Sequence, residues 1–258
     1  MDINSELKES FLKSLMESGK NLKFFKNLPM ELRKEPDFII ETLKALKENE
    51  AYVGQYEDSV HEIIKELTID KNLALKLVNY HGYLICKLPK EFKDDEDVII
   101  SAIHNYPYSL VYCSKEAKDN KKIVLEAVKV RGDNLESVSK RLRSDEEVVL
   151  NAVKNDGNAI NFSDFNLWHN KDIMLAAAKT NKHVLQYLPE ELEGNKDISL
   201  AAYKGDKFAY EYFSKELKKE IVDNNIEDIA SYLESAILAE DLQQEMSQSN
   251  IQAKKVKI

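Results

Sequence analysis

Apolar residues recur with a period of 25 residues between Asp70 and Lys219. In each copy they stand 3, 5, 7, 15 and 22 positions after a polar residue that can cap a helix. These polar starts are Asp70, Asp95, Asn120, Asp145, Asn170 and Asn195. Six copies in register predict helical repeats whose apolar faces are buried only by stacking against neighbouring copies.

The copy that starts at Asp145 shows how one repeat is built. The Asp145 carboxylate can accept hydrogen bonds from the first helical turn, so we expect it to be an N-cap. Val148, Val149 and Ala152 then follow on one face of a helix. Gly157 stands where a helix often ends in a left-handed residue, and we expect that conformation there. A second short helix is expected around Ile160 and Phe162, followed by a closing turn.

The sequence therefore predicts an all-α fold, an α-solenoid of short two-helix repeats. We divide it into irregular helical units at 1–69, regular repeats at 70–219, and a capping helix with a polar tail at 220–258. The start at Asp70 lies 35 residues after a comparable start at Glu35, which leaves about ten extra residues near 49–68. Such insertions are typically loops that carry binding specificity, and the alternative, which we favour, is a degenerate N-terminal cap. The segment from 239 to 258 is polar, so its composition predicts a mobile tail, and the alternative is a segment that lies against the body of the protein.

The amino-acid composition limits the kinds of protein to which the chain can belong. With 43% hydrophobic and 32% charged residues the chain is typical of a folded protein without membrane spans. A formal net charge of −9 disfavours nonspecific polyanion binding and suggests a partner with a basic surface. Cys86 and Cys113 are too few for a disulfide framework, and the acidic N-terminus is no signal peptide, so a cytoplasmic location is expected.

Two stretches carry a family resemblance. Val149-Leu150-Asn151-Ala152-Val153-Lys154 and Leu185-Gln186-Tyr187-Leu188-Pro189-Glu190-Glu191-Leu192 resemble the bacterial helical-repeat family catalogued as domain of unknown function 4116. The resemblance covers Asp70 to Lys219 well and residues 6–69 poorly. It implies an all-helical array and no known catalytic residues.

The search for chemistry finds no catalytic motif. His61-Glu62-Ile63-Ile64-Lys65 misses the zinc motif H-E-x-x-H because lysine replaces the second ligand. Both cysteines are expected to be packing thiols. The sequence therefore predicts no catalytic residue, no metal and no cofactor, and it leaves the oligomeric state open.

Three hypotheses for function remain. The first is a protein-interaction module, an adaptor or inhibitor, whose contact patch is a group of tyrosines and histidines near the turns of two adjacent repeats. That group is Tyr80, His81, Tyr83, His104, Tyr106 and Tyr108. The second is nucleic-acid or other polyanion binding through a column of lysines, one per repeat: Lys129, Lys154, Lys179 and Lys204. The third is an enzyme with an unrecognised site at 49–68. The aromatic column Tyr112, Phe162, Tyr187 and Tyr212 is expected to be core between repeats.

Overall fold

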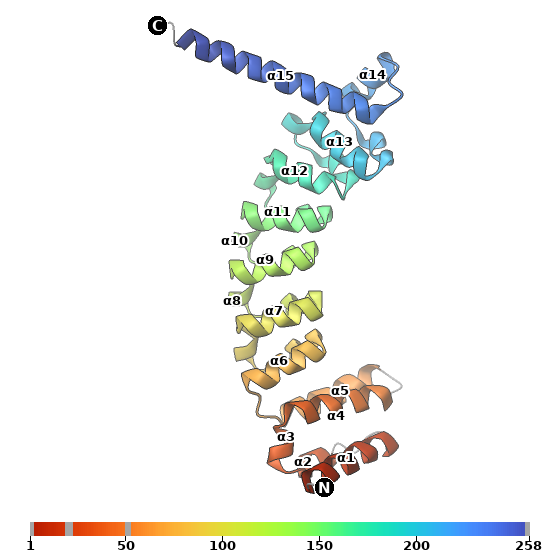
Figure 1. Ribbon diagram of the computed structural model, residues 1–258, viewed down its shortest axis with the longest axis vertical. Coiled ribbons are helices and arrows are strands. Elements are labelled where there is room, and N and C mark those ends of the chain that lie inside the picture. The colour runs from red at the N-terminus through yellow and green to blue at the C-terminus, as the bar shows by residue number, and fades with distance from the viewer. Residues whose placement is uncertain (1–2, 19–22, 50–52, 256–258) are drawn as a thin grey trace. The chain divides into compact units, whose positions relative to one another are not determined.

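A computed structural model describes residues 3–18, 23–49 and 53–255 (Figure 1). The chain forms two compact units, 1–127 and 128–258, with the boundary inside α9 (Lys121–Val130). The described residues form helices and their connections, and they include no strand. The predicted fold class, an all-α solenoid of helical repeats, is confirmed.

The helices of the first unit are α1 (Ile3–Ser18), α2 (Lys23–Asn27), α3 (Met30–Arg33), α4 (Pro36–Asn49), α5 (Val53–Lys65), α6 (Lys71–Tyr80), η1 (Gly82–Lys87), η2 (Lys90–Lys93), α7 (Glu96–Asn105), η3 (Pro107–Tyr112) and α8 (Lys115–Lys118). Elements marked η are 3-10 helices.

The helices of the second unit are η4 (Gly132–Ser137), α10 (Lys140–Arg143), α11 (Glu146–Asn155), η5 (Gly157–Phe162), η6 (Phe165–His169), α12 (Lys171–Ala178), η7 (Lys182–Tyr187), η8 (Glu190–Leu192), α13 (Lys196–Gly205), η9 (Lys207–Tyr212), α14 (Lys215–Asp223) and α15 (Ile229–Lys255).

Each long helix of the regular repeats begins at the predicted cap. Asp70 Oδ1 accepts a hydrogen bond from Leu73 N at 2.8 Å, and Asp145 Oδ1 accepts one from Val148 N at 3.1 Å. The other four starts make the equivalent bond. These bonds satisfy backbone donors that have no partner within the helix, which fixes where each repeat begins.

The apolar columns form the core, to different degrees. Residues 3, 7 and 22 positions after the start are buried in all six repeats, and those 5 positions after it are half-buried. The long helices pack against the next ones along the chain, α6 on α7 in the first unit and α11 on α12 on α13 in the second (Figure 1). Neighbouring repeats therefore supply each other's core, as the period predicts.

The expected role of Gly157 is wrong. Asp156 leaves α11 in an extended conformation with a φ of −144°, so no left-handed residue is needed to end the helix. Only Gly194 among the described glycines has a positive φ, of 74°. Gly157 is needed for a close approach instead, because a Cβ there would lie 2.3 Å from the carbonyl oxygen of Ala177 in the next repeat.

Each repeat contains a third element that the sequence reading described only as a closing turn. The second element is a 3-10 helix of about two turns, such as η5, and a short third helix follows it. Ser114 and Ser139 cap this third helix, with Oγ accepting from backbone N–H groups at 3.0 and 3.3 Å. The long helices and the 3-10 helices thus form two layers, joined through the third helices.

Asparagine side chains link consecutive repeats. Asn105 at the end of α7 accepts a hydrogen bond from Gly82 N at 2.6 Å and donates one to Asn79 O at 2.9 Å. Asn155 makes the two equivalent bonds in the second unit, at 2.8 and 2.9 Å. Each side chain thus satisfies both backbone groups that are exposed where the preceding repeat turns from its long helix to its 3-10 helix.

The N-terminal insertion is helical rather than a loop. Residues 50–52 lie outside the described part, and on its far side the chain forms α5. Val60, Ile63 and Ile64 of α5 are buried. The irregular N-terminal segment therefore has a pair of longer α-helices, α4 and α5, where each regular repeat has a long α-helix followed by a 3-10 helix.

The expected mobile tail is also wrong for the residues that the structure describes. The helix predicted around Leu233 continues without a break to Lys255 as α15, and residues 256–258 lie outside the described part. Leu233 is buried and α15 packs on α13, so the helix covers the last repeat as expected of a cap. From Leu238 onward its described side chains are exposed.

Candidate binding surface

The 3-10 helices of the first unit bring most of the predicted tyrosine and histidine patch together. We call His81, Tyr83, Tyr106, Tyr108 and Tyr112 the tyrosine–histidine cluster. Tyr83 of η1 packs edge-on against Tyr106 and Tyr112, with ring centroids 6.0 and 5.3 Å apart. Tyr106 contacts Tyr108 at 5.6 Å. Two adjacent repeats therefore share one aromatic surface, in which Tyr108 is 42% exposed.

His81 joins the cluster through Tyr83 and Tyr106, at 6.2 and 6.1 Å. Burial lowers its pKa, and the positive charge of Lys47 lowers it further. The imidazole is therefore neutral at neutral pH, and its Nδ1 has no hydrogen-bond partner among the described residues.

Two members of the predicted patch lie outside the cluster. Tyr80 is half-buried at the end of α6. His104 is exposed on α7, with its Nε2 3.9 Å from a carboxylate oxygen of Glu126. The patch is therefore smaller than predicted, and Tyr112, which was expected in the core, joins it.

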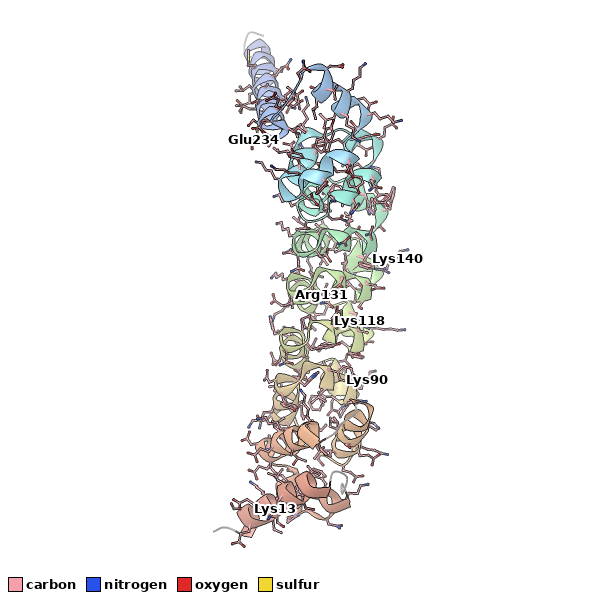
Figure 2. The ribbon with its side chains drawn as sticks, turned by 90° about the vertical axis from the view of Figure 1, so that its right-hand side faces the viewer. Lys13, Lys90, Lys118, Arg131, Lys140 and Glu234 are labelled. Carbon is pink, nitrogen blue, oxygen red and sulfur yellow. The ribbon has the colours of Figure 1, made fainter. Side chains whose placement is uncertain are left out.

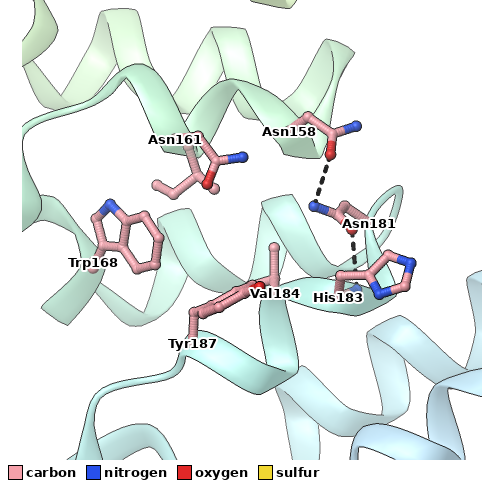
Figure 3. Close-up of a pocket in the computed structure, with 8 residues that line it drawn as sticks. Asn158, Asn161, Trp168, Asn181, His183, Val184 and Tyr187 are labelled. Carbon is pink, nitrogen blue, oxygen red and sulfur yellow. Dashed lines mark hydrogen bonds between the residues drawn. The ribbon is translucent and has the colours of Figure 1, made fainter.

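A hollow lies in the second unit, on the side of its repeats formed by the 3-10 helices. It has a volume of about 380 Å³, and we call it the Trp168 pocket (Figure 3). The rings of Trp168 and Tyr187 line one side, with centroids 6.5 Å apart. On the other side, Asn158 accepts a hydrogen bond from the Asn181 amide at 3.1 Å. The volume falls in the range of small-molecule and side-chain pockets.

Sequence reasoning missed this pocket and placed Tyr187 in the core. Tyr187 is instead 60% exposed. A signal for Trp168 was present in the repeat alignment, because its position is otherwise charged. The equivalent residues are Lys93, Lys118, Arg143, Glu193 and Lys218.

Those lysines have a defined structural role that tryptophan cannot perform. Lys93 and Lys118 donate to the carbonyls of Cys86 and Val111, at 2.8 and 2.7 Å, and so close the end of their 3-10 helices. Lys118, like Lys90 and Lys140, stands on the third-helix side of its repeat (Figure 2). At the equivalent place in the fourth repeat, an indole faces the pocket instead.

The predicted lysine column is exposed but not uniform. Lys129, Lys154, Lys179 and Lys204 all lie at the surface. Lys204 is paired with Glu234 of α15, at 2.6 Å. Lys154 and Lys179 form no ion pair within the described residues.

The other candidate residues lie apart from these surfaces. His61 and Glu62 are exposed on α5, and the described residues hold no group of three His, Cys, Asp or Glu side chains arranged for a metal. Cys113 is buried, and burial raises the pKa of its thiol to about 12. Cys86 is half-buried, and both cysteines are free. Cys113 thus has the packing role that was expected of it.

The search for membrane spans covered the described helices. None combines the length and the apolar character that crossing a bilayer needs.

Comparison with known proteins identifies the repeats. No curated protein matches the chain, and no solved structure does. The sequence model of a family described as Domain of unknown function (DUF4116) matches residues 70–116, 120–168 and 170–218. These segments make up more than half of the chain and each spans about two of the 25-residue repeats. The chain belongs to the DUF4116 family.

Proposed function

We propose that the chain is a non-catalytic interaction module that binds another protein along the face formed by its 3-10 helices. The tyrosine–histidine cluster is the observation that carries this proposal. Tyrosine combines a large apolar ring with a hydroxyl and loses little conformational entropy when it is buried, so it is enriched where proteins bind one another. Tyr108 and the nearby Val111, which is 48% exposed, leave apolar surface open to a partner.

Charge supports a basic partner. The chain has a formal net charge of −9, and acidic side chains of the second unit stand beside or on its 3-10 helices at Asp156 and Glu211, whereas Asp133 is paired with Arg131. A basic surface would be attracted to this face over several ångströms before contact. Two free cysteines favour a reducing location, and we place the module in the cytoplasm.

The test compares a bait altered on this face with the wild-type chain and with a control altered on the layer of long helices. The wild-type chain, a Tyr108→Ala/Val111→Ser variant and an Asn72→Ala control are used to capture proteins from native lysate. Asn72 is exposed on α6, in the layer of long helices. We expect one protein to be retained by the wild-type and control baits and lost with the double variant. Equal recovery by all three baits, or recovery of no protein by a folded bait, would contradict the proposal.

Polyanion binding is the second candidate, favoured by the exposed and unpaired Lys154 and Lys179. It predicts that captured nucleic acid is released steeply as salt rises, and that Lys154→Ala/Lys179→Ala lowers the salt dependence. Capture that is unaffected by salt and by these substitutions would exclude it.

A further inference from the structure

The Trp168 pocket is formed and flanked by aromatic side chains, two of which, Phe165 and Trp168, stand at positions that are otherwise charged. Phe165 is 64% exposed, and its equivalents in the other repeats are Lys90, Lys115, Lys140, Glu190 and Lys215. Its ring lies 5.8 Å from that of Trp168. With Tyr187, the fourth and fifth repeats thus present three aromatic side chains in or beside one hollow. Grouped aromatic side chains at a surface hollow are typical of interaction or ligand-binding sites.

The polar side of the pocket offers amides. Asn158 and Asn181 hydrogen-bond to each other, and Asn181 also accepts from His183 N at 3.0 Å, so their side chains are held in place. Asn161 is exposed on η5, between Trp168 and Asn158 (Figure 3). Its amide makes no hydrogen bond to any other described residue. A side-chain amide provides both a donor and an acceptor, which matches the N–H and C=O of a peptide backbone.

The residues that line the Trp168 pocket disfavour binding of a charged ligand group inside it. Its residues include no carboxylate, lysine or arginine. Three residues after Tyr187 the chain enters η8, beside a second hollow of about 340 Å³. Four glutamates line that hollow: Glu190, Glu193, Glu216 and Glu220. The Trp168 pocket therefore lies on the fourth and fifth repeats and the acidic hollow on the fifth and sixth, so the fifth repeat contributes to both.

We propose that the Trp168 pocket binds an extended peptide segment of a partner protein, with an apolar side chain against Trp168 and Tyr187. A lysine or arginine beside that side chain in the peptide reaches the glutamate hollow, and the Asn161 amide pairs with the peptide backbone. Extended segments fit because aromatic-lined grooves bind them with little loss of entropy. This inference rests on the proposed function and names a partner chemistry for it.

The test selects ligands without knowledge of the natural partner. A phage library of random 12-residue peptides is panned against the full chain, and enriched peptides are synthesised with a fluorescent label. We expect enrichment of sequences with an apolar residue next to lysine or arginine. Their Kd, measured by fluorescence polarisation, should rise at least about tenfold with Trp168→Ala and with the exposed-site variant Asn161→Ala. Binding should also quench or shift the emission of Trp168, the only tryptophan in the chain.

Phe208→Ala serves as the matched control, because Phe208 is 68% exposed on η9 outside this pocket. Its Kd should match that of the wild-type chain. Peptides that depend on Tyr108 but not on Trp168 or Asn161 would overturn this inference and leave the proposed function standing. No enrichment, enrichment of acidic peptides, or Trp168-dependent binding on a glycan array would overturn it as well.

Discussion

At the scale of single residues, the junctions between repeats depend on a few side chains and, at one position, on a glycine that has no side chain. Asn155 joins two repeats through two backbone hydrogen bonds, whereas Gly157 allows two backbones to touch. Asn155 contacts the preceding repeat and Gly157 contacts the following one, so neither acts mainly on its own helix. Their contributions are therefore measured best as effects on unfolding of the whole stack.

Replacing Asn155 should loosen one junction. Asn155→Ala removes both hydrogen bonds, and because the side chain is exposed, water can replace part of them. We expect the free energy of unfolding in urea to fall by about 1 kcal/mol. Asn151→Ala is the control, since Asn151 bonds only to Glu147 O within its own helix. Equal effects of the two substitutions would show that the link between repeats adds nothing.

Replacing Gly157 should cost more. Gly157→Ala places a methyl group 2.3 Å from the Ala177 carbonyl, so one of the two repeats must shift. We expect a loss of about 1–3 kcal/mol in the same urea experiment. Lys207→Ala, at the equivalent position of the last repeat, already has a Cβ and should leave stability within about 0.5 kcal/mol. A Gly157→Ala variant as stable as the wild-type chain would contradict the close packing.

These residues also show how far sequence reasoning reaches. The caps at Asp70 and Asp145 were predictable because a cap acts within its own helix. The reason that position 157 requires glycine was not predictable, and neither was the exposure of Tyr187. Both depend on how closely the next repeat approaches. The sequence carried a signal for Trp168, an aromatic residue at an otherwise charged position, but we made no prediction from it, and its pocket needed coordinates.

At the scale of elements, the last helix is held by a polar junction as well as by Leu233. Tyr232 of α15 donates a hydrogen bond to Glu220 of α14, and Lys196 of α13 lies 3.3 and 3.2 Å from Glu220 and Glu240. The Tyr232 hydroxyl, and then Lys196, hold the pKa of Glu220 below its usual value, although partial burial opposes this. Three helices therefore meet on one ionised carboxylate.

Acid should weaken this junction. Because the pKa of Glu220 is lower in the folded chain, its stabilisation is fully present above the usual value of 4.5 and is lost as the pH falls through the folded value. The thermal midpoint should therefore drop between pH 7 and pH 3.5, and the drop should be smaller in Glu220→Gln. Glu227→Gln, an exposed neighbour, serves as the control. An equal drop in Glu220→Gln and the wild-type chain would remove Glu220 from this role.

The helix that these residues hold was predicted only in part. The spacing of Ile229, Leu233 and Ile237 indicated a capping helix. The polar composition after Ala239 indicated a tail, because composition reports burial and not whether a helix continues into solvent. The structure shows α15 continuing through these residues to Lys255.

At the scale of the whole molecule, the long helices within each unit pack on the next ones along the chain, so stability should be nearly additive over the repeats of a unit. Residues 145–169 form one complete period, from one cap to the residue before the next. Deleting them joins Ser144 to Asn170 in the same register. We expect mean residue ellipticity to stay unchanged and unfolding to remain cooperative.

The control deletion removes residues 145–157, which takes away α11 and leaves the rest of the repeat without its partner helix. It should lose ellipticity and cooperativity. If the full-period deletion were as disruptive as this control, stacking of equivalent repeats would be the wrong description.

We propose that the 3-10 helices of each unit bind a partner while the long helices support them. Hydrogen exchange of the full chain, alone and saturated with the protein that the wild-type bait captures, tests this directly. We predict slowed exchange in η1, η3, η5 and η7, with α6, α7 and α11 unchanged. Protection confined to α11 and α12, at whose C-terminal ends Lys154 and Lys179 lie, or no protection at all, would contradict it.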